Sequence, residues 1–447
     1  MLRRIRVLAA VAAVGCTPGA MIAIPAPSGP PVDAATGSTA SPGSDPTTAP
    51  SPGATTVPPC AAIDAVERGY VPQDASVDGA LSACTAAIHP TAGASGSVLT
   101  LSVDATGPVV VSAVDPGGRS LLAPTRVDDG AEVPVAPVVS GELLVTVAPV
   151  GDDATQPPLD YTLAVTCADG CDRWFTRYPV VLLHGLGGAS AFGGVDYFYG
   201  VPGDLAANGA VVVAPSVSPF APPADRAAEW SVEVDALLAT GHRRVNLIAH
   251  SLGGLDARVL ASPGGLDRGD VIASVTTIGT PHDGTDVADL IDLGLASGTI
   301  DPALLDLAAT IFATLFGISA DDPAFPEAIH AMTTDEARAL DAVTPDAPDT
   351  VYGSWAGHSC GVLEPWCQDD RGGEVVDGTL AASYLLIWPK ANDGLVPTAS
   401  QHHGAFLGEL WADHADEIGQ IQDDENPAFD HLQFYRDEIG RLRALGL

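Results

Sequence analysis

Two kinds of hydrophobic pattern follow each other along the chain. Between about residues 95 and 167, apolar and polar positions alternate in short segments such as SVLTLSVDA and LDYTLAVTC, which Gly, Pro and Asp residues separate. Alternate residues of such segments line one face of a strand. Several short alternating strands predict a small antiparallel β-sandwich, which we assign to residues 60–171. The expected inward-facing residues include Leu99, Leu101, Val103, Tyr161, Leu163 and Val165.

After Cys171 the pattern changes to near-continuous apolar runs, each followed by a glycine-bearing turn and a helix-like stretch. Strands of this kind are typical of a parallel sheet that helices bury on both faces. Residues 172–447 are therefore predicted to form an α/β domain of the doubly wound type. The five runs expected to be strands are YPVVLLHG, AVVVAPSV, RVNLIAHS, VTTIGTP and SYLLIWP.

The first 59 residues carry neither pattern. Residues 1–24 begin with a basic stretch and a short apolar run, MLRRIRVLAAVAAVGC, which is typical of a secretory signal peptide. Cys16 closes that run, so the alternative to secretion is a bacterial lipoprotein anchored through a lipid on Cys16. Residues 25–59 are rich in Pro, Ser, Thr, Gly and Ala and predict a disordered linker.

The charge balance limits the classes of molecule that the protein can bind. The 447 residues contain 56 Asp and Glu against 19 Lys and Arg, a formal net charge of -37. Such a chain repels nucleic acid and anionic membrane surfaces, so no nucleic-acid partner is expected. The acids are spread along the chain, which favours a solvated acidic surface on a secreted monomer over a surface built to attract a cationic substrate.

Six cysteines follow Cys16, and an even number in an exported chain favours disulfides. We expect pairing within segments, Cys360 with Cys367 and the other four among themselves. A zinc site is the rival interpretation, but the sequence has no Cys-x-x-Cys pair.

A serine stands where one apolar run meets a helix-like stretch, in RVNLIAHSLGGLDARVL. A strand over residues 245–249 would pass into a helix near Gly253, with Ser251 at the turn. Such a turn is so tight that it needs small residues two before and two after the serine, and Ala249 and Gly253 meet that need. The pattern predicts that Ser251 is a nucleophile, although a pentapeptide of this kind also recurs by chance.

A glycine-rich loop, HGLGG, follows the run YPVVLLHG. If it faces the serine, the Leu186 N–H and the Leu252 N–H together form a candidate oxyanion hole. The alternative is a plain glycine turn.

Two further loops supply a carboxylate and an imidazole. Asp393 lies in an Asn-Asp-Gly turn after SYLLIWP, a triplet that by itself is more often only a turn signal. His414 follows in LWADHADEIGQ. The order Ser251, Asp393, His414 is the one required of a catalytic triad on this fold. Three other histidines compete for the role of base, of which the first two follow Asp393 too closely for a returning loop: His402, His403 and His431.

The stretch from about Arg177 to Gln420 resembles the true lipases of bacterial family I, the Pseudomonas and Burkholderia type of triacylglycerol lipase. The matching strings, in the family's order, are YPVVLLHGLGG, AHSLGGLDAR, VTTIGTPHDGTDVADL, AMTTDEARAL, YGSWAG, NDGLVPTAS and HADEIGQ. The resemblance implies an α/β-hydrolase fold with a helical lid. By position it implies these roles: nucleophile Ser251, acid Asp393, base His414, and oxyanion donors Leu186 and Leu252.

The same resemblance implies one structural calcium ion that fixes the loop bearing the catalytic histidine. Its ligands by position would be the carboxylates of Asp377 and Asp416, with main-chain oxygens of Gln420 and near Asp424. Two carboxylates plus carbonyls suit a hard cation. Simple solvation of the two acids is the alternative.

The resemblance implies a secreted carboxylic ester hydrolase, a triacylglycerol lipase that works through an acyl-enzyme at an oil–water interface. Residues 291–325 are apolar over most of their length, so they are either buried or form a lid over the acyl pocket. Phospholipase, acyltransferase or short-chain esterase activity on the same fold is the first alternative. The second, of another class, is a binding protein with an inactive hydrolase domain, in which the sandwich contacts a surface or polymer.

Overall fold

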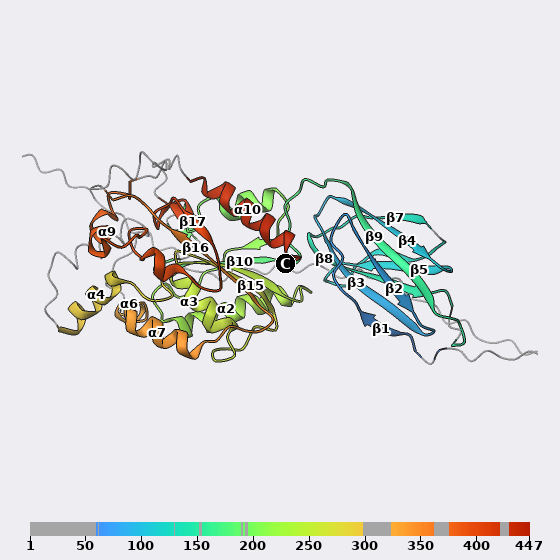
Figure 1. Cartoon of the computed structure of the whole chain (residues 1–447), viewed down its shortest axis with the longest axis horizontal. Helices are drawn as coiled ribbons and strands as arrows, with labels where there is room; N and C mark the ends of the chain where they lie inside the picture. The colour runs from blue at the N-terminus through green and yellow to red at the C-terminus, as the bar shows by residue number, and fades with distance from the viewer. Residues whose placement is uncertain are drawn as a thin grey trace, which may run out of the picture. The chain divides into compact units, whose positions relative to one another are not determined.

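The structure is a computed structural model, and it describes residues 60, 62–128, 130–151, 154–188, 191–192, 195–297, 323–361, 375–420 and 429–447 (Figure 1). The predicted signal peptide (1–24), the linker (25–59) and Cys16 lie outside these residues. None of the described helices is both long enough and apolar enough to cross a membrane.

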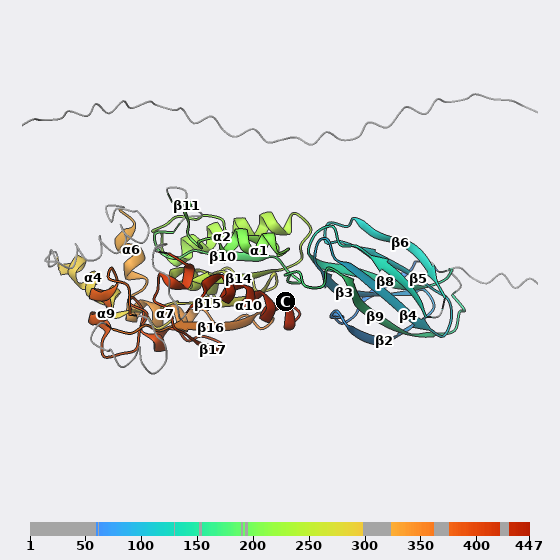
Figure 2. The same ribbon diagram turned by 90° about the horizontal axis from the view of Figure 1, so that it is seen from above.

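Residues 64–169 form two stacked β-sheets, seen as two layers in Figure 2. Alternate residues of β4, β5, β8 and β9 point into the space between the sheets, where Leu99, Leu101, Leu163 and Val165 are buried as predicted. The five-stranded sheet has the order β1 (Asp64–Glu67), β3 (Thr85–Gly93), β8 (Gly141–Pro149), β5 (Val109–Val114), β6 (Ser120–Val127). The four-stranded sheet has the order β2 (Ala75–Leu81), β9 (Leu159–Asp169), β4 (Val98–Ala105), β7 (Ala131–Val135). All strand pairs are antiparallel except β1 with β3.

The second part contains a six-stranded sheet in which every strand pair is parallel. Its strands carry the buried apolar runs that the sequence predicted, because helices cover both faces. The order is β13 (Val212–Val213), β10 (Val180–Leu183), β14 (Val245–His250), β15 (Ile272–Ile278), β16 (Val351–Gly357), β17 (Ala405–Leu410). A two-stranded hairpin, β11 (Ala191–Phe192) and β12 (Val195–Asp196), lies outside this sheet.

Alternate residues of the central strands belong to two hydrophobic cores, one on each face of the sheet. One core contains Val180 of β10 with residues of α1 and α10, and the other contains Val181 with residues of α2 and α3. The helices are α1 (Val201–Ala207), α2 (Pro223–Leu238), α3 (Leu252–Ala261), α4 (Asp286–Ser297), α6 (Phe325–His330), α7 (Thr334–Val343), α9 (Ala381–Ile387) and α10 (His431–Ala444). Two short 3-10 helices are η1 (Thr398–Gln401) and η2 (Asp416–Ile418).

One predicted strand is wrong. The run SYLLIWP forms helix α9, and the two remaining strands of the sheet are β16 and β17 instead. Tyr384 and Ile387, three residues apart, are buried, whereas the two leucines between them are exposed. Burial at this spacing is that of an amphipathic helix, so an apolar run of this length did not distinguish the two structures.

The disulfides connect cysteines within each segment, as predicted for four of them: Cys60 pairs with Cys84, and Cys167 pairs with Cys171. Cys360 is also disulfide-bonded. Its predicted partner, Cys367, lies outside the described residues.

Candidate active site

The chain turns sharply at Ser251, between β14 and α3. Ser251 has a φ of 55°, in the left-handed region that residues with a Cβ rarely adopt. A Cβ on Gly253 would lie 2.7 Å from the carbonyl oxygen of His184, so this position needs glycine. The Ser251 N–H donates a 2.9 Å hydrogen bond to the carbonyl of Ile278, at the end of β15. The turn therefore has the tight strand-to-helix geometry that the sequence predicted.

The loop after β10 lies directly against this turn. A Cβ on Gly185 would lie 2.7 Å from the Cβ of Ser251. Leu186 and Leu252 are both buried. The Leu252 N–H is the first of helix α3 and has no acceptor within the helix, and the Leu186 N–H has no backbone acceptor among the described residues. Two unpaired N–H groups next to a serine are the donors that an oxyanion hole requires.

A fully buried ion pair supports this loop. The Arg226 side chain, on α2, donates from Nη2 to the carbonyl oxygen of His184 (2.5 Å) and from Nε to Asp256 Oδ2 (2.8 Å). Neither member of the ion pair has any exposed side-chain surface. Trp230 Nε1 donates to the same Asp256 oxygen at 3.0 Å. Because a guanidinium fixes the directions of its donors, Arg226 holds the first residue of the HGLGG loop in place.

The electrostatics of this group keep the His184 ring neutral. Burial first, and then the positive charge of Arg226, lower the pKa of His184 to about 3. The neutral ring donates from Nδ1 to the Gly185 carbonyl (3.0 Å) and accepts at Nε2 from the Val217 N–H (3.1 Å), which assigns its tautomer. Burial raises the pKa of Asp256 to about 6 against the opposing effect of Arg226, so the carboxylate remains ionised at neutral pH.

Asp393 and His414 form a buried hydrogen-bonded pair. His414 Nδ1 lies 2.8 Å from Asp393 Oδ2, and the His414 N–H donates to the Asp393 carbonyl at 2.8 Å. Asp393 Oδ1 accepts the N–H groups of Leu395 and Val396 (2.8 and 2.7 Å), and Gln401 Nε2 donates to Oδ2 (3.1 Å). These donors satisfy a carboxylate that has no exposed surface.

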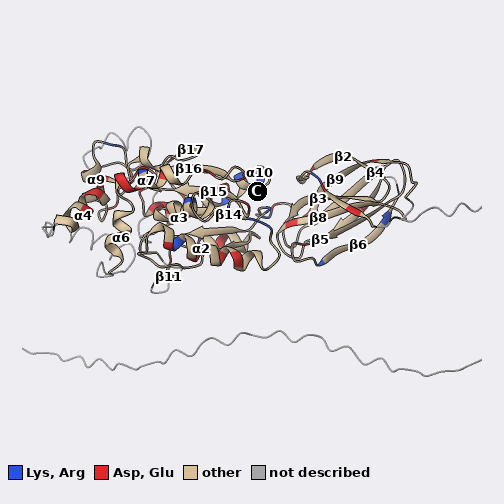
Figure 3. Cartoon of the chain, turned by 90° about the horizontal axis from the view of Figure 1, so that it is seen from below, with Lys and Arg blue, Asp and Glu red and all other residues tan. Residues whose placement is uncertain are grey.

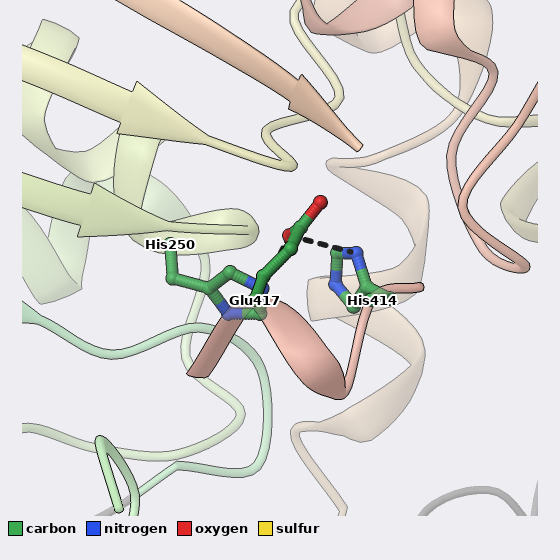
Figure 4. A group of neighbouring side chains, drawn as sticks. All are labelled: His250, His414 and Glu417. Atoms are coloured by element: carbon green, nitrogen blue, oxygen red, sulfur yellow. Dashed lines mark hydrogen bonds and ion pairs between the residues drawn. The ribbon is translucent and has the colours of Figure 1, made fainter. Parts of the chain in front are cut away.

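A second carboxyl, Glu417, lies beside this pair. Figure 4 shows Glu417 between the rings of His250 and His414. Glu417 Oε2 lies 2.9 Å from His250 Nε2 and 3.8 Å from His414 Nδ1. Burial, and next the charge of Asp393, raise the pKa of Glu417 well above its usual range. In the described part of the chain this is the one group of three metal-binding side chains within reach of one another. A metal ion there would prevent His414 from transferring protons.

Residues next to Ser251 and at the end of β15 lie close to His414. The ring of His250, the residue before Ser251, has its centroid 4.5 Å from that of His414. A Cβ on Gly279, directly after β15, would lie 3.1 Å from His414 Nδ1. Ser251 Oγ has no hydrogen-bond partner among the described residues. Ser251 follows β14, His414 lies beside Gly279 after β15, and Asp393 lies beside Gly357 at the end of β16, so all three predicted residues are at the carboxyl edge of the sheet.

The competing histidines have other partners. His403 pairs with Asp346 at 2.8 Å and its ring stacks on that of His282. The His402 ring packs against Phe406, and His431 Nε2 contacts the Tyr199 carbonyl at 3.0 Å.

The two predicted carboxylate ligands of calcium lie around a third acid, Asp413, which sequence reasoning missed. Asp413 Oδ2 accepts the Asp377 N–H (2.8 Å), and Asp416 Oδ2 accepts the Asp413 N–H (3.2 Å). Burial, and then the charge of Asp416, raise the pKa of Asp413 to about 7. A cation beside Asp413 and Asp416 would relieve this repulsion, and carboxylates are ligands that calcium prefers. Within the described residues, however, Asp377, Asp413 and Asp416 do not form a group of three ligand atoms within 4.8 Å of one another. Gln420 closes the same loop, and Asp424 lies outside the described residues.

The predicted lid also lies mostly outside the described residues. Helix α4 contains its first part, and residues 298–322 are not described.

Comparisons with known proteins identify the fold and the family of the chain. The family model for the α/β hydrolase fold matches residues 178–322. A triacylglycerol lipase of Vibrio cholerae is 33% identical over 61% of this chain and 89% of its own length. Triacylglycerol lipases of Pseudarthrobacter phenanthrenivorans and Burkholderia plantarii are each 30% identical over 61% of this chain, and over 98% and 87% of their own lengths. The chain is a member of the bacterial triacylglycerol lipase family. The predicted α/β-hydrolase fold and ester hydrolase activity are thereby confirmed.

Sequence reasoning missed the buried groups that surround the active site of this family member. Arg226 lies 25 residues before Ser251, and nothing in its local sequence distinguishes it from a surface arginine. Glu417 follows His414 within the run HADEIGQ, so its proximity to the histidine was a usable signal. The burial of Glu417 could not be predicted, because acidic residues are common throughout this chain.

Proposed function

We propose that this ester hydrolase cleaves triacylglycerols through an acyl-enzyme on Ser251. The observation that carries the proposal is the 2.8 Å contact between His414 Nδ1 and Asp393 Oδ2, buried beside a serine with positive φ. The relatives named as triacylglycerol lipases support the choice of substrate.

In the first half of the reaction, Ser251 Oγ attacks the ester carbonyl while His414 Nε2 takes its proton. Because Nδ1–H of His414 donates to Asp393, Nε2 is the free acceptor, and the carboxylate stabilises the imidazolium that forms. The N–H groups of Leu186 and Leu252 bind the oxyanion of the tetrahedral intermediate. When the intermediate collapses, His414 donates its proton to the departing glycerol oxygen.

In the second half, water attacks the acyl-enzyme by the same route and His414 again transfers the proton. The hydrogen bond between Ser251 Oγ and His414 forms as substrate binds, since such bonds are often long in the free enzyme. Release of the fatty acid restores the serine hydroxyl.

We also propose a calcium ion held by Asp377 and Asp416, with main-chain oxygens of the loop that follows His414. The ion would neutralise the carboxylates and fix that loop. Asp413, the residue before His414, accepts the Asp377 N–H and donates its own N–H to Asp416 Oδ2, so it connects both proposed ligands to the histidine loop. A chelator should lower both the thermal midpoint and the ester turnover, and unchanged values for both would contradict the site.

The predicted signal peptide supports an exported protein, which we propose is a monomer. An N-terminal sequence and mass of the mature protein from culture medium would test this, because a lipid on Cys16 would instead give a cell-bound form.

The test of the main proposal is hydrolysis of p-nitrophenyl esters of graded chain length and of emulsified triolein. Wild type should act on both, and Ser251→Ala should lose at least about a thousandfold in turnover. Ser76→Ala, at an exposed serine of β2, is the control and should retain full activity. Activity on soluble short-chain esters alone would make this chain an esterase. A Ser251→Ala enzyme with full turnover would exclude the mechanism.

A further inference from the structure

Tyr197 lies between two loops of the active site, and the mechanism above gives it no role. It follows the hairpin strand β12 and is buried. Its hydroxyl oxygen lies 2.8 Å from Nδ1 of His250, the residue before Ser251. A Cβ on Gly185 would lie 2.7 Å from the same hydroxyl oxygen. The hydroxyl therefore touches both the HGLGG loop and the turn that carries the nucleophile.

On the loop side, Tyr197 fixes one peptide group together with Arg226. Burial raises the pKa of the Tyr197 hydroxyl, and a hydrogen bond from the Gly185 N–H opposes that increase. The carbonyl of the same planar peptide, that of His184, accepts from Arg226 Nη2 at 2.5 Å. Both polar ends of this peptide are thus held by side chains. The next N–H along the chain is the oxyanion donor of Leu186.

On the other side, His250 passes the connection to the loop that carries the catalytic histidine. His250 Nε2 lies 2.9 Å from Glu417 Oε2. Burial first, and then the charge of His414, lower the pKa of His250 well below its usual range, so the ring is neutral and has one donor nitrogen. The Tyr197 O–H donates to Nδ1, and Nε2–H donates to Glu417, which assigns the tautomer of His250.

These hydrogen bonds run in one direction, from Gly185 through Tyr197 and His250 to Glu417, and we call these four residues the donor chain. They belong to three segments: the HGLGG loop with its hairpin, the turn at Ser251, and the 3-10 helix η2. Hydrogen bonds in such a series strengthen one another. The donor chain therefore couples the positions of three segments that sequence order does not bring together.

The two central members of the donor chain are neutral in a strongly acidic protein. The net charge is -37, and Figure 3 shows acidic residues over both the sandwich and the α/β part. The His250 ring centroid lies 4.5 Å from that of His414, which becomes an imidazolium during the reaction. A second positive ring at this distance would oppose that step. A neutral tyrosine and a neutral histidine hold the geometry without this repulsion.

We propose that Tyr197 and His250 are positioning residues for acyl transfer, which hold the Leu186 N–H in register with the turn at Ser251. An oxyanion donor is effective only when it is already aimed at the place where the negative charge develops, and a misplacement of about 1 Å lowers turnover by up to about a hundredfold. The inference rests on the proposed acyl-enzyme at Ser251, but it holds for any ester substrate.

The first test is Tyr197→Phe, which removes the hydroxyl and keeps the ring. For p-nitrophenyl butyrate, kcat should fall at least about tenfold while KM stays within about twofold. The inhibition constant of a trifluoromethyl ketone, which forms a tetrahedral adduct on the serine, should rise by the factor by which kcat/KM falls. Tyr352→Phe is the matched control. Its buried hydroxyl accepts the Ala347 N–H (3.1 Å) at the amino end of β16, so its loss should lower the thermal midpoint and leave kcat unchanged.

The second test is a double-mutant cycle with His250→Gln. If Tyr197 and His250 act through one donor chain, the double variant should lose about the same factor in kcat as the more damaging single variant. Independent roles would instead multiply the two losses. Thermal midpoints of all three variants show that the folded enzyme is compared in each case.

A folded Tyr197→Phe enzyme with unchanged kcat would overturn the proposal, and so would multiplied losses in the double variant. A higher KM at unchanged kcat would place the hydroxyl on the substrate and also overturn the positioning role. Wild type that cleaves soluble esters but not triolein would refute only the triacylglycerol substrate, and the two tests above would still decide the role of Tyr197. Wild type that cleaves no ester would refute the proposed function and this proposal together.

Discussion

The sandwich buries different side chains from the catalytic edge, which is the carboxyl edge of the parallel sheet where Ser251, Asp393 and His414 lie. The space between the sandwich sheets is filled almost entirely by aliphatic residues such as Leu101 and Leu163. The catalytic edge instead buries His250, Asp393 and Glu417, none of which has any exposed surface. Full burial of a leucine stabilises a fold by about 1.5–3 kcal/mol, whereas a buried carboxyl is unfavourable unless it is hydrogen-bonded. The sandwich core therefore contributes stability, and the catalytic edge positions charge.

The two buried carboxyl groups of the catalytic edge are not equally well hydrogen-bonded. Asp393 accepts two backbone N–H groups as well as the His414 ring. Glu417 Oε1 is buried with no hydrogen-bond partner among the described residues. Changes at this edge should therefore affect turnover more than folding, and the reverse should hold for the sandwich.

The largest effect is expected from Asp393→Asn. The amide can no longer hold the His414 ring in the tautomer that leaves Nε2 free, so kcat should fall about ten-thousandfold. The measurement is turnover of p-nitrophenyl butyrate, with Asp283→Asn at an exposed position as the control. A loss of less than about tenfold would mean that another acid, of which Glu417 is the nearest to the ring, orients His414.

The next effect is on stability, from Arg226→Met. Removing one member of a buried ion pair leaves the Asp256 carboxylate uncompensated and should cost about 3–5 kcal/mol of unfolding free energy. It also frees the His184 carbonyl, so turnover should fall together with stability.

Urea unfolding followed by tryptophan fluorescence suits this measurement, because all six tryptophans lie after residue 171 and report only the α/β part. The control is Lys390→Met, since Lys390 pairs with Asp286 in the α/β part and both side chains are largely exposed. Exposed pairs contribute little, so no shift is expected there. Similar midpoints for the two variants would show that the buried pair does not support the fold.

A third effect should appear in the sandwich alone, from Leu163→Ala. Leu163 is completely buried between the sheets, so the cavity should cost about 3 kcal/mol of local stability. Hydrogen exchange of β4 and β9 should become faster, while turnover of a soluble ester stays at the wild-type level. Loss of turnover equal to the loss of protection would show that the active site depends on the sandwich core.

Comparison of the sequence with the structure shows which features of the fold a local sequence pattern can predict. Alternation predicted the sandwich residues, and continuous apolar runs predicted β10, β14 and β15, because one-faced and two-faced burial leave different periods in the sequence. The tight turn at Ser251 could be predicted because it requires small residues within two positions of the serine. The strand predicted for SYLLIWP was wrong because a run of this length suits either a strand or a short helix.

The buried polar groups could not be predicted from the sequence, and the reason is physical. Arg226 and Asp256 are 30 residues apart, and their pairing is fixed by the packing of α2 on α3 rather than by any local period. Glu417 is buried because the chain after His414 packs against the ends of β15 and β16, where Gly279 and Gly357 lie beside its carboxyl group. Local pattern identifies residues whose role is fixed by their immediate neighbours, whereas Asp393 and His414 were assigned from their order after Ser251 and from the family resemblance.

The smallest effect is a change in the pH dependence of stability, from His282→Gln. Burial first, and then the neighbouring His403, lower the pKa of His282 well below 6.5 in the folded protein. Below about pH 6.5 the unfolded chain binds a proton at this ring that the folded chain does not bind. The folded state therefore loses up to about 1.4 kcal/mol for each pH unit below that value, and this part of the stability is fully present only above it.

The variant lacks this ring, so its stability should approach that of wild type as the pH falls from 7 to 5. Thr277→Val is the matched control: it removes the 3.0 Å contact to His282 Nε2 but keeps the buried imidazole, and so should retain the wild-type slope. Urea midpoints at several pH values measure both. A constant difference between wild type and His282→Gln would mean that the ring is protonated to the same extent in the folded and unfolded states. Its burial would then carry no electrostatic cost, and the contrast with the aliphatic sandwich core would not extend beyond the triad.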